Sequence, residues 1–174
     1  MPIPDWYAGT ATFCSASLTP ERFRPDFAGP SGAIPIGMNP KAIELQARTN
    51  RFATAVINLC ERLPKNAVTN EIVPQLIDSS GSTDSNYRAT CRARSDAEFI
   101  SKIGVALEEA DESKGWLELL VSSNQVSIDE ARPLIKEANE LVSIFVTSQK
   151  TAKRNKAARE RLAKEAKRVK RPRA

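Results

Sequence analysis

Apolar residues recur with the period of an α-helix through the middle of the chain. Between residues 41 and 64 they alternate steps of four and three positions, at Leu45, Thr49, Phe52, Val56, Leu59 and Leu63. A stripe of this kind is the face that a helix turns toward a helical bundle. We expect this first helix to end at Pro64, because proline cannot continue a helix without losing a hydrogen bond.

A second, less regular stripe follows at Val73, Leu76, Ser80, Thr83 and Tyr87. Pro74 is tolerated in a first helical turn, so the second helix is predicted to begin near Glu71. Residues 79–82, with the sequence Ser-Ser-Gly-Ser, allow two interpretations. They form either a kinked turn or a place where small side chains let a neighbouring helix approach closely. The helical pattern resumes over residues 87–94.

Two capping-box sequences predict where the third and fourth helices begin. They are Ser95-Asp96-Ala97-Glu98 and Ser127-Ile128-Asp129-Glu130. In such a box the serine oxygen accepts from the glutamate amide, and the carboxylate accepts in return from the serine amide. The third stripe runs through Ile100, Ile103, Leu107, Ala110, Leu117 and Val121. This helix is predicted to be buried on more than one side, because it has a second apolar flank at Phe99, Trp116 and Leu120.

The fourth stripe lies at Leu134, Ala138, Leu141 and Phe145, and good helix formers continue to Pro172. Pro133 leaves two starts open: a short turn after Ser127 followed by a kink, or a helix that begins at Pro133. A helix from residue 133 to about 169 would be roughly 55 Å long at 1.5 Å per residue, so its end should project past the others. Short connections between consecutive helices predict an all-α fold, an antiparallel up-down-up-down four-helix bundle.

Charge is distributed unevenly along the 174 residues. Residues 1–149 carry 14 basic and 19 acidic residues, whereas residues 150–174 carry 12 basic and 2 acidic ones. The overall net charge of +5 therefore combines a mildly acidic body with a strongly basic end. We divide the chain into an N-terminal leader of residues 1–37, a four-helix bundle of residues 38–149 and a basic helical tail of residues 150–174.

The leader has no sustained helical period. It holds six of the 11 prolines and four of the seven glycines, and proline opposes helix at and before its own position. We expect the leader to be irregular or disordered. Two alternatives stay open: its aromatic side chains dock on a partner, or translation starts at Met38, the only methionine besides Met1.

The sequence contains no histidine, which reduces the kinds of catalytic and metal-binding site that the chain can form. Without it there is no Ser-His-Asp or Cys-His pair, and none of the Glu-x-x-His metal motifs of ferritin-like bundles. The three cysteines form no CxxC motif, which disfavours zinc. Five acidic residues of the third helix are expected to form a solvated face or an oligomer contact: Glu108, Glu109, Asp111, Glu112 and Glu118. The chain is predicted not to be an enzyme and to need no cofactor or metal.

Two further absences bear on the cellular location. No run approaches the roughly 20 apolar residues of a membrane helix. The start lacks the basic region followed by an apolar stretch that marks a secretory signal. Three cysteines, an odd number, argue against a disulfide framework. We therefore predict a cytoplasmic protein with no membrane partner.

Several motifs of the second, third and fourth helices resemble those of a known family in order and spacing. They are Asn86-Tyr87-Arg88-Ala89, Arg92-Ala93-Arg94-Ser95, Glu98-Phe99, Glu108-Glu109-Ala110-Asp111-Glu112-Ser113, Trp116-Leu117-Glu118-Leu119-Leu120, and Glu137-Ala138-Asn139-Glu140-Leu141 followed by Ile144. Over about residues 40–155 the chain resembles the bacterial four-helix bundle proteins that are also called 23S rRNA-intervening sequence proteins.

This resemblance implies a homopentamer of antiparallel four-helix bundles around a central channel. Some members of the family are encoded in insertions within large-subunit ribosomal RNA genes. A relative is the accessory protein of diversity-generating retroelements, which works with a reverse transcriptase and with nucleic acid through a basic surface. The resemblance thus implies RNA or DNA as a partner, and a reverse transcriptase if the chain serves a retroelement.

The basic tail is the first candidate nucleic-acid-binding site. Lysine and arginine side chains contact phosphate backbones without reading sequence. In the tail they are Lys150, Lys153, Arg154, Lys156, Arg159, Arg161, Lys164, Lys167, Arg168, Lys170, Arg171 and Arg173. One alternative is a solubilising tail. Another is a membrane-surface helix, which is disfavoured because the thin apolar line has only two large residues, Leu162 and Val169.

A second candidate site lies on the second helix. Arg88 and Arg92 are one turn apart and share a face, and Tyr87 adjoins them. They form either a phosphate-contact patch with a ring for base stacking, or salt bridges to the acidic third helix within or between subunits. Arg94 is placed to pair with Glu98.

These features together predict a non-enzymatic, oligomeric protein that binds nucleic acid. The alternative is a structural or protein-interaction module whose basic tail only aids solubility.

Overall fold

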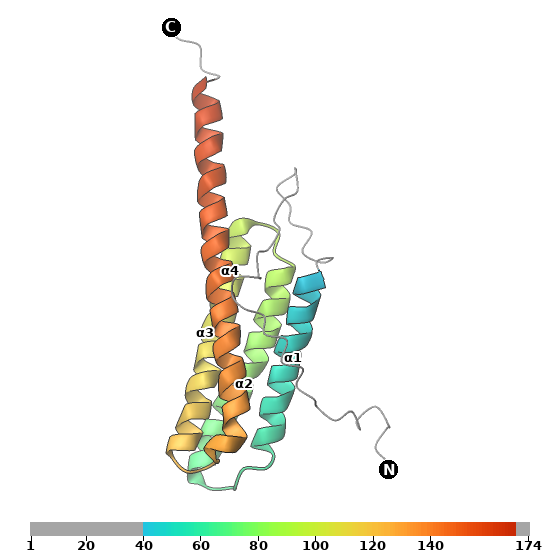
Figure 1. The fold of residues 1–174 in the computed structure, drawn as a ribbon, viewed down its shortest axis with the longest axis vertical. Helices are drawn as coiled ribbons and strands as arrows, with labels where there is room; N and C mark the ends of the chain where they lie inside the picture. The colour runs from blue at the N-terminus through green and yellow to red at the C-terminus, as the bar shows by residue number, and fades with distance from the viewer. Residues whose placement is uncertain (1–39, 170–174) are drawn as a thin grey trace.

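A computed structural model describes residues 40–169, which form four helices in antiparallel succession (Figure 1). The helices are α1 (Pro40–Cys60), α2 (Ala67–Cys91), α3 (Asp96–Ser122) and α4 (Ile128–Val169). The predicted all-α four-helix bundle is therefore confirmed. The leader of residues 1–37 lies outside the described residues, as do Lys170, Arg171 and Arg173. No helix of the described part is long and apolar enough to cross a membrane.

Each helix packs along its neighbour in the sequence, and α1 and α4 close the ring with the slightest of the four contacts between adjacent helices. The stripe predicted for α1 is buried at Leu45, Thr49, Phe52, Val56 and Leu59. The helix ends at Cys60 rather than at Pro64. A tight turn follows, in which the amide of Arg62 donates to the carbonyl of Leu59 at 3.0 Å. Leu63, the last residue of the predicted stripe, is half-buried in this turn.

The start of α2 lies at Ala67, four residues before the predicted one. Asn66 caps the helix: its side-chain oxygen accepts from the amides of Val68 and Thr69 at 2.9 and 3.0 Å, and the Thr69 hydroxyl accepts from the Asn66 amide at 3.1 Å. Pro74 consequently lies in the helix interior. Asn70, whose carbonyl cannot receive an amide proton from Pro74, is an exposed residue, so solvent reduces the cost of the missing bond.

The serine-rich stretch of α2 is a close helix contact and not a break. The helix runs without interruption from Ala67 to Cys91. Ser79 and Ser80 are buried, and the hydroxyl of Ser113 on α3 donates to that of Ser79 at 2.9 Å. Small side chains let the two helices approach and join by this hydrogen bond. The predicted continuation of the helix to residue 94 is wrong, since α2 ends at Cys91 and the Arg92 amide caps its last turn.

Both capping serines accept the predicted hydrogen bond from a glutamate amide. Neither glutamate carboxylate, however, accepts from the amide of its own capping serine. Ser95 accepts from the amide of Glu98 at 3.1 Å, whereas the Glu98 carboxylate accepts from the amide of Arg94 at 2.9 Å instead of from that of Ser95. This bond lowers the pKa of Glu98. Ser127 accepts from the amide of Glu130 at 3.3 Å and donates to its carboxylate at 2.9 Å. The capping serines place the starts of α3 and α4 correctly, and α4 begins before Pro133.

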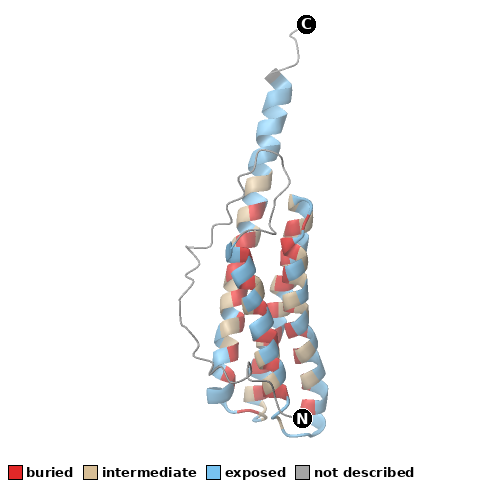
Figure 2. Ribbon diagram, turned by 90° about the vertical axis from the view of Figure 1, so that its right-hand side faces the viewer, coloured by how far each residue is buried: buried red, intermediate tan, exposed pale blue. Residues whose placement is uncertain are grey.

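The two apolar flanks of α3 are both used within one chain, because α3 packs along α2 and along α4. Phe99 and Leu120 are buried and Trp116 is half-buried. Buried residues lie between the helices and end at Ala152 on α4 (Figure 2). Because α4 has 42 residues, it is about 63 Å long at 1.5 Å per residue, and its exposed end projects past the other three helices (Figure 1).

Candidate nucleic-acid interface

The described part of the tail presents most of its cations to solvent. Arg159 is bound to Asp96, and Lys153 donates to the side-chain oxygen of Gln149 at 3.0 Å. Lys156 lies 3.9 Å from Glu160, a weak pair. Six cations are exposed and have no acidic partner within residues 40–169: Lys150, Arg154, Arg161, Lys164, Lys167 and Arg168. The predicted Lys170 and Arg171 lie beyond the described residues.

The tail cations gather on one side of α4. With about 100° between successive residues of a helix, eight of them share an arc of roughly 160°. This basic face consists of Lys150, Lys153, Arg154, Lys156, Arg161, Lys164, Lys167 and Arg168. The other side is an uncharged stripe of Thr151, Asn155, Ala158, Leu162 and Ala166. Leu162 is 66% exposed and cannot contribute to the core.

Arg159 points away from the basic face and attaches the tail to the bundle. Its guanidinium donates to the Asp96 carboxylate at 3.1 Å. Asp96 is the first residue of α3, where the helix dipole favours a negative charge. Since the bond joins the first exposed turns of the tail to a second helix, it helps to fix the direction in which α4 projects.

Arginines of the α2–α3 connection lie at the same end of the bundle as this attachment (Figure 1). Arg92 is exposed and has no acidic partner among the described residues. Arg94 is paired with Glu98 at 3.4 Å as predicted, but its side chain is 89% exposed. The basic face of the tail and these two arginines therefore give one end of the molecule a positive surface.

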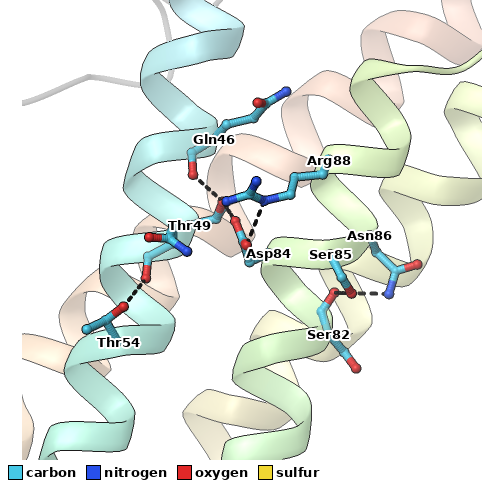
Figure 3. Close-up of polar contacts among 9 residues, drawn as sticks. Gln46, Thr49, Thr54, Ser82, Asp84, Ser85, Asn86 and Arg88 are labelled. Carbon is cyan, nitrogen blue, oxygen red and sulfur yellow. Dashed lines mark hydrogen bonds and ion pairs between the residues drawn. The ribbon is translucent and has the colours of Figure 1, made fainter.

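Arg88 has an acidic partner, although not the one expected. Its Nε donates to Asp84 of the same helix at 2.8 Å, and no ion pair with α3 is formed in the described chain (Figure 3). The other oxygen of Asp84 accepts from the hydroxyl of Thr49 on α1 at 2.7 Å. Asp84 thus joins α1 to α2, and Arg88 neutralises it. Arg88 is primarily a structural residue, and its side chain is 45% exposed.

Tyr87 is removed from the candidate surface. Its side chain is only 4% exposed and its ring stacks on that of Phe145, with centroids 5.4 Å apart. Burial raises the pKa of Tyr87. The prediction of a ring available for base stacking is wrong, because the helical turn that exposes Arg88 points Tyr87 into the core.

An ion-pair cluster not identified from the sequence closes the bundle between α1 and α4. Arg48 of α1 binds Glu137 of α4 through Nε and Nη2, and its Nη2 also binds Glu140. The hydrogen bond to Glu137 raises the pKa of Arg48. The side chains of Arg48 and Glu137 are 13% and 16% exposed. This cluster spans the adjacent helix pair with the least packing, so its role is to hold the fold that supports the tail.

Two buried cysteines and one glutamate of the described residues have raised pKa values. Burial raises the pKa of Cys60 to about 11 and also raises that of Cys91, so both thiols stay protonated and weakly nucleophilic. Glu109 has a raised pKa because of burial and of the neighbouring Glu112. Within residues 40–169 no cluster of three or more His, Cys, Asp or Glu side chains could hold a metal ion.

Comparisons with known proteins agree with this architecture. The family model described as 23S rRNA-intervening sequence protein matches residues 41–147. A crystal structure of a protein of unknown function from the S23 ribosomal protein family of Bacteroides thetaiotaomicron is 26% identical, with a TM-score of 0.56. The similarity covers 63% of this chain and 98% of that one. No curated protein matches the sequence. The family match ends before the basic tail begins.

Proposed function

The chain belongs to the 23S rRNA-intervening sequence protein family, and we propose that it is a non-enzymatic, oligomeric four-helix bundle protein that binds nucleic acid through the basic face of α4. The observation that carries this proposal is the gathering of eight cations, seven exposed and Lys156 half-exposed, on one side of a helix that projects from the bundle. A helix that projects in this way can bring its cations to a phosphate backbone without steric interference from the body.

Binding by this face depends on the release of counterions from the phosphates. Each neutralised phosphate releases condensed cations, so affinity falls steeply as salt rises, while contacts to phosphates carry no sequence information. Arg92 and Arg94 add contacts at the base of the tail if the nucleic acid extends along the bundle end. The tail lies outside residues 41–147, which the family model matches. The proposed binding of nucleic acid therefore depends on a part of this chain that the family match does not include.

Neutralising three arginines of the basic face tests the proposal. Arg154→Gln/Arg161→Gln/Arg168→Gln is expected to weaken binding of a 20-nucleotide probe by about tenfold or more at low salt, and to flatten the log–log salt slope by about 2 to 3. The matched control, Arg62→Gln/Lys65→Gln/Lys136→Gln, removes the same charge from exposed positions nearer the opposite end. Fluorescence anisotropy measures both variants. Equal losses in the two would mean that net charge and not the basic face governs binding.

Assembly is proposed through the end of the bundle that lies away from the tail. Of the six large apolar side chains that are exposed among the described residues, four lie in that half, near the α1–α2 and α3–α4 connections: Ile57, Val68, Leu119 and Ile128. The family resemblance implies a pentamer. An interface in this half would leave the basic faces of all copies free, and several tails on one side would raise the effective concentration of cations.

Light scattering coupled to size exclusion is expected to give about five protomer masses for the full chain. The variant Ile57→Glu/Leu119→Glu should form smaller species, because two charges in an apolar interface oppose association. The control Ile43→Glu changes an exposed isoleucine at the other end of α1 and should leave the mass unchanged. A monomer at micromolar concentration would refute the assembly proposal.

The exposed apolar side chains also favour a second candidate function. They suit a structural or protein-interaction module whose tail only aids solubility. If the full chain binds no nucleic acid at low salt, this candidate replaces the first.

A further inference from the structure

The basic face of α4 is divided into two rows of cations along the helix. Lys150, Arg154, Arg161 and Arg168 follow one line, and Lys153, Lys156, Lys164 and Lys167 follow another. The two lines are about a quarter turn apart at 100° per residue. Ala157, an exposed residue with a short side chain, lies between them. The helix thus carries cations on two flanks with space for close approach between the flanks.

Two cationic flanks fit a groove that is bordered by two phosphate backbones. An α-helix is about 10–12 Å wide with its side chains, and the major groove of B-form DNA, roughly 12 Å wide, admits one. From Lys150 to Arg168 the basic face is about 27 Å long, less than one turn of the duplex at about 34 Å. One row can therefore contact each strand while the uncharged stripe with Leu162 faces away from the DNA.

Proteins that bind single-stranded nucleic acid commonly stack its bases on exposed aromatic rings. The described part of this chain offers no such ring. No aromatic residue occurs in residues 150–174. Tyr87, the ring nearest to the arginines of α2, is buried against Phe145. Trp116 is half-buried, and its indole nitrogen donates to Glu112 at 2.9 Å. Within residues 40–169 phosphate contact remains, which favours a ligand that places two backbones at a fixed separation.

Double-stranded RNA fits this arrangement less well. The major groove of A-form RNA is deep and narrow and does not admit an α-helix. Its minor groove is wide and shallow, so it does not place a phosphate backbone on each side of a bound helix. The tail is a continuous helix to Val169 and is fixed at its base by the bond between Arg159 and Asp96. A helix that is formed and oriented before binding loses little backbone conformational entropy when it enters a groove.

We propose that the tail of α4 binds duplex DNA in preference to duplex RNA and to single strands, with its two cationic rows on the two backbones of the major groove. This inference rests on the proposed function and names its ligand class. Glu160 lies within the second row and is paired weakly with Lys156 at 3.9 Å. It weakens the positive charge of that row, so Glu160→Gln is expected to strengthen binding to duplex DNA two- to threefold.

The test compares four probes of one sequence with the full chain: a 20-base-pair DNA duplex, the RNA duplex, and single-stranded DNA and RNA. At equal phosphate concentration and about 100 mM salt, the DNA duplex is expected to bind roughly tenfold more tightly than each of the others, since only it offers both backbones to the two rows. Two variants, Arg161→Gln/Arg168→Gln and Lys164→Gln/Lys167→Gln, each remove half of one row. Either should reduce the preference for duplex over single-stranded DNA at least threefold.

The control Arg62→Gln/Lys65→Gln loses the same charge nearer the far end and should keep the preference. Equal or tighter binding of the RNA duplex or of either single strand overturns the duplex DNA assignment and leaves the proposed function standing. A preference that persists in both row variants also overturns it, because the rows would then not produce the preference. Binding of none of the four probes at 50 mM salt overturns the proposed function as well.

Discussion

Replacing Arg48 by methionine is expected to lower the free energy of unfolding by about 3 kcal/mol, because it leaves a largely buried carboxylate without its partner. Glu137 receives two hydrogen bonds from Arg48 and is 16% exposed. The α1–α4 contact that contains this cluster is the slightest between adjacent helices, so few other interactions can compensate. Urea denaturation followed by circular dichroism measures the loss.

Two controls separate the ion pair from the change in side-chain volume. Arg48→Met/Glu137→Met replaces both partners by apolar side chains of similar length and should restore stability to within about 1 kcal/mol of the parent. Arg51→Met, at an exposed position of the same helix, should change stability by no more than about 0.5 kcal/mol. If the single variant at position 48 loses less than about 1 kcal/mol, the cluster does not hold α1 to α4.

A helix could be predicted from the sequence where it carries a regular apolar stripe or a capping serine. The stripe of α1 and the capping serines of α3 and α4 identify three of the four helices, since apolar spacing and N-terminal capping act locally. The start of α2 was not found because its cap is Asn66 paired with Thr69, a version of the box without glutamate. Pro74 then suggested a later start, although an exposed Asn70 makes proline tolerable there.

The candidate site was predicted in part. The sequence alone shows the run of cations in the tail, and the period of the helix places eight of them on one face. Tyr87 was assigned to the surface although it also belongs to the apolar stripe of α2, and the structure follows the stripe. Arg48 could not be identified, because its partners are 89 and 92 residues away and no local pattern connects them. The pairing of Arg88 with Asp84, in contrast, has the spacing of a local helical ion pair.

A chain that ends at Lys156 is expected to lose at least about 100-fold in affinity for nucleic acid at low salt. The change removes eight basic and two acidic residues. It removes no buried residue among positions 157–168, so the melting temperature of the bundle should stay close to that of the full chain. Thermal unfolding by circular dichroism is the control that the shortened chain is folded.

The dependence of affinity on salt, measured for the full chain and for the chain ending at Lys156 on one DNA duplex, tests most directly whether the tail binds phosphate. For the full chain, the logarithm of the association constant should fall with the logarithm of salt concentration with a slope of about −5 or steeper, at roughly −0.9 per phosphate neutralised. The shortened chain should give a slope shallower by about 3 or more. Parallel lines for the two chains, or no binding by the full chain at 50 mM salt, would contradict the account.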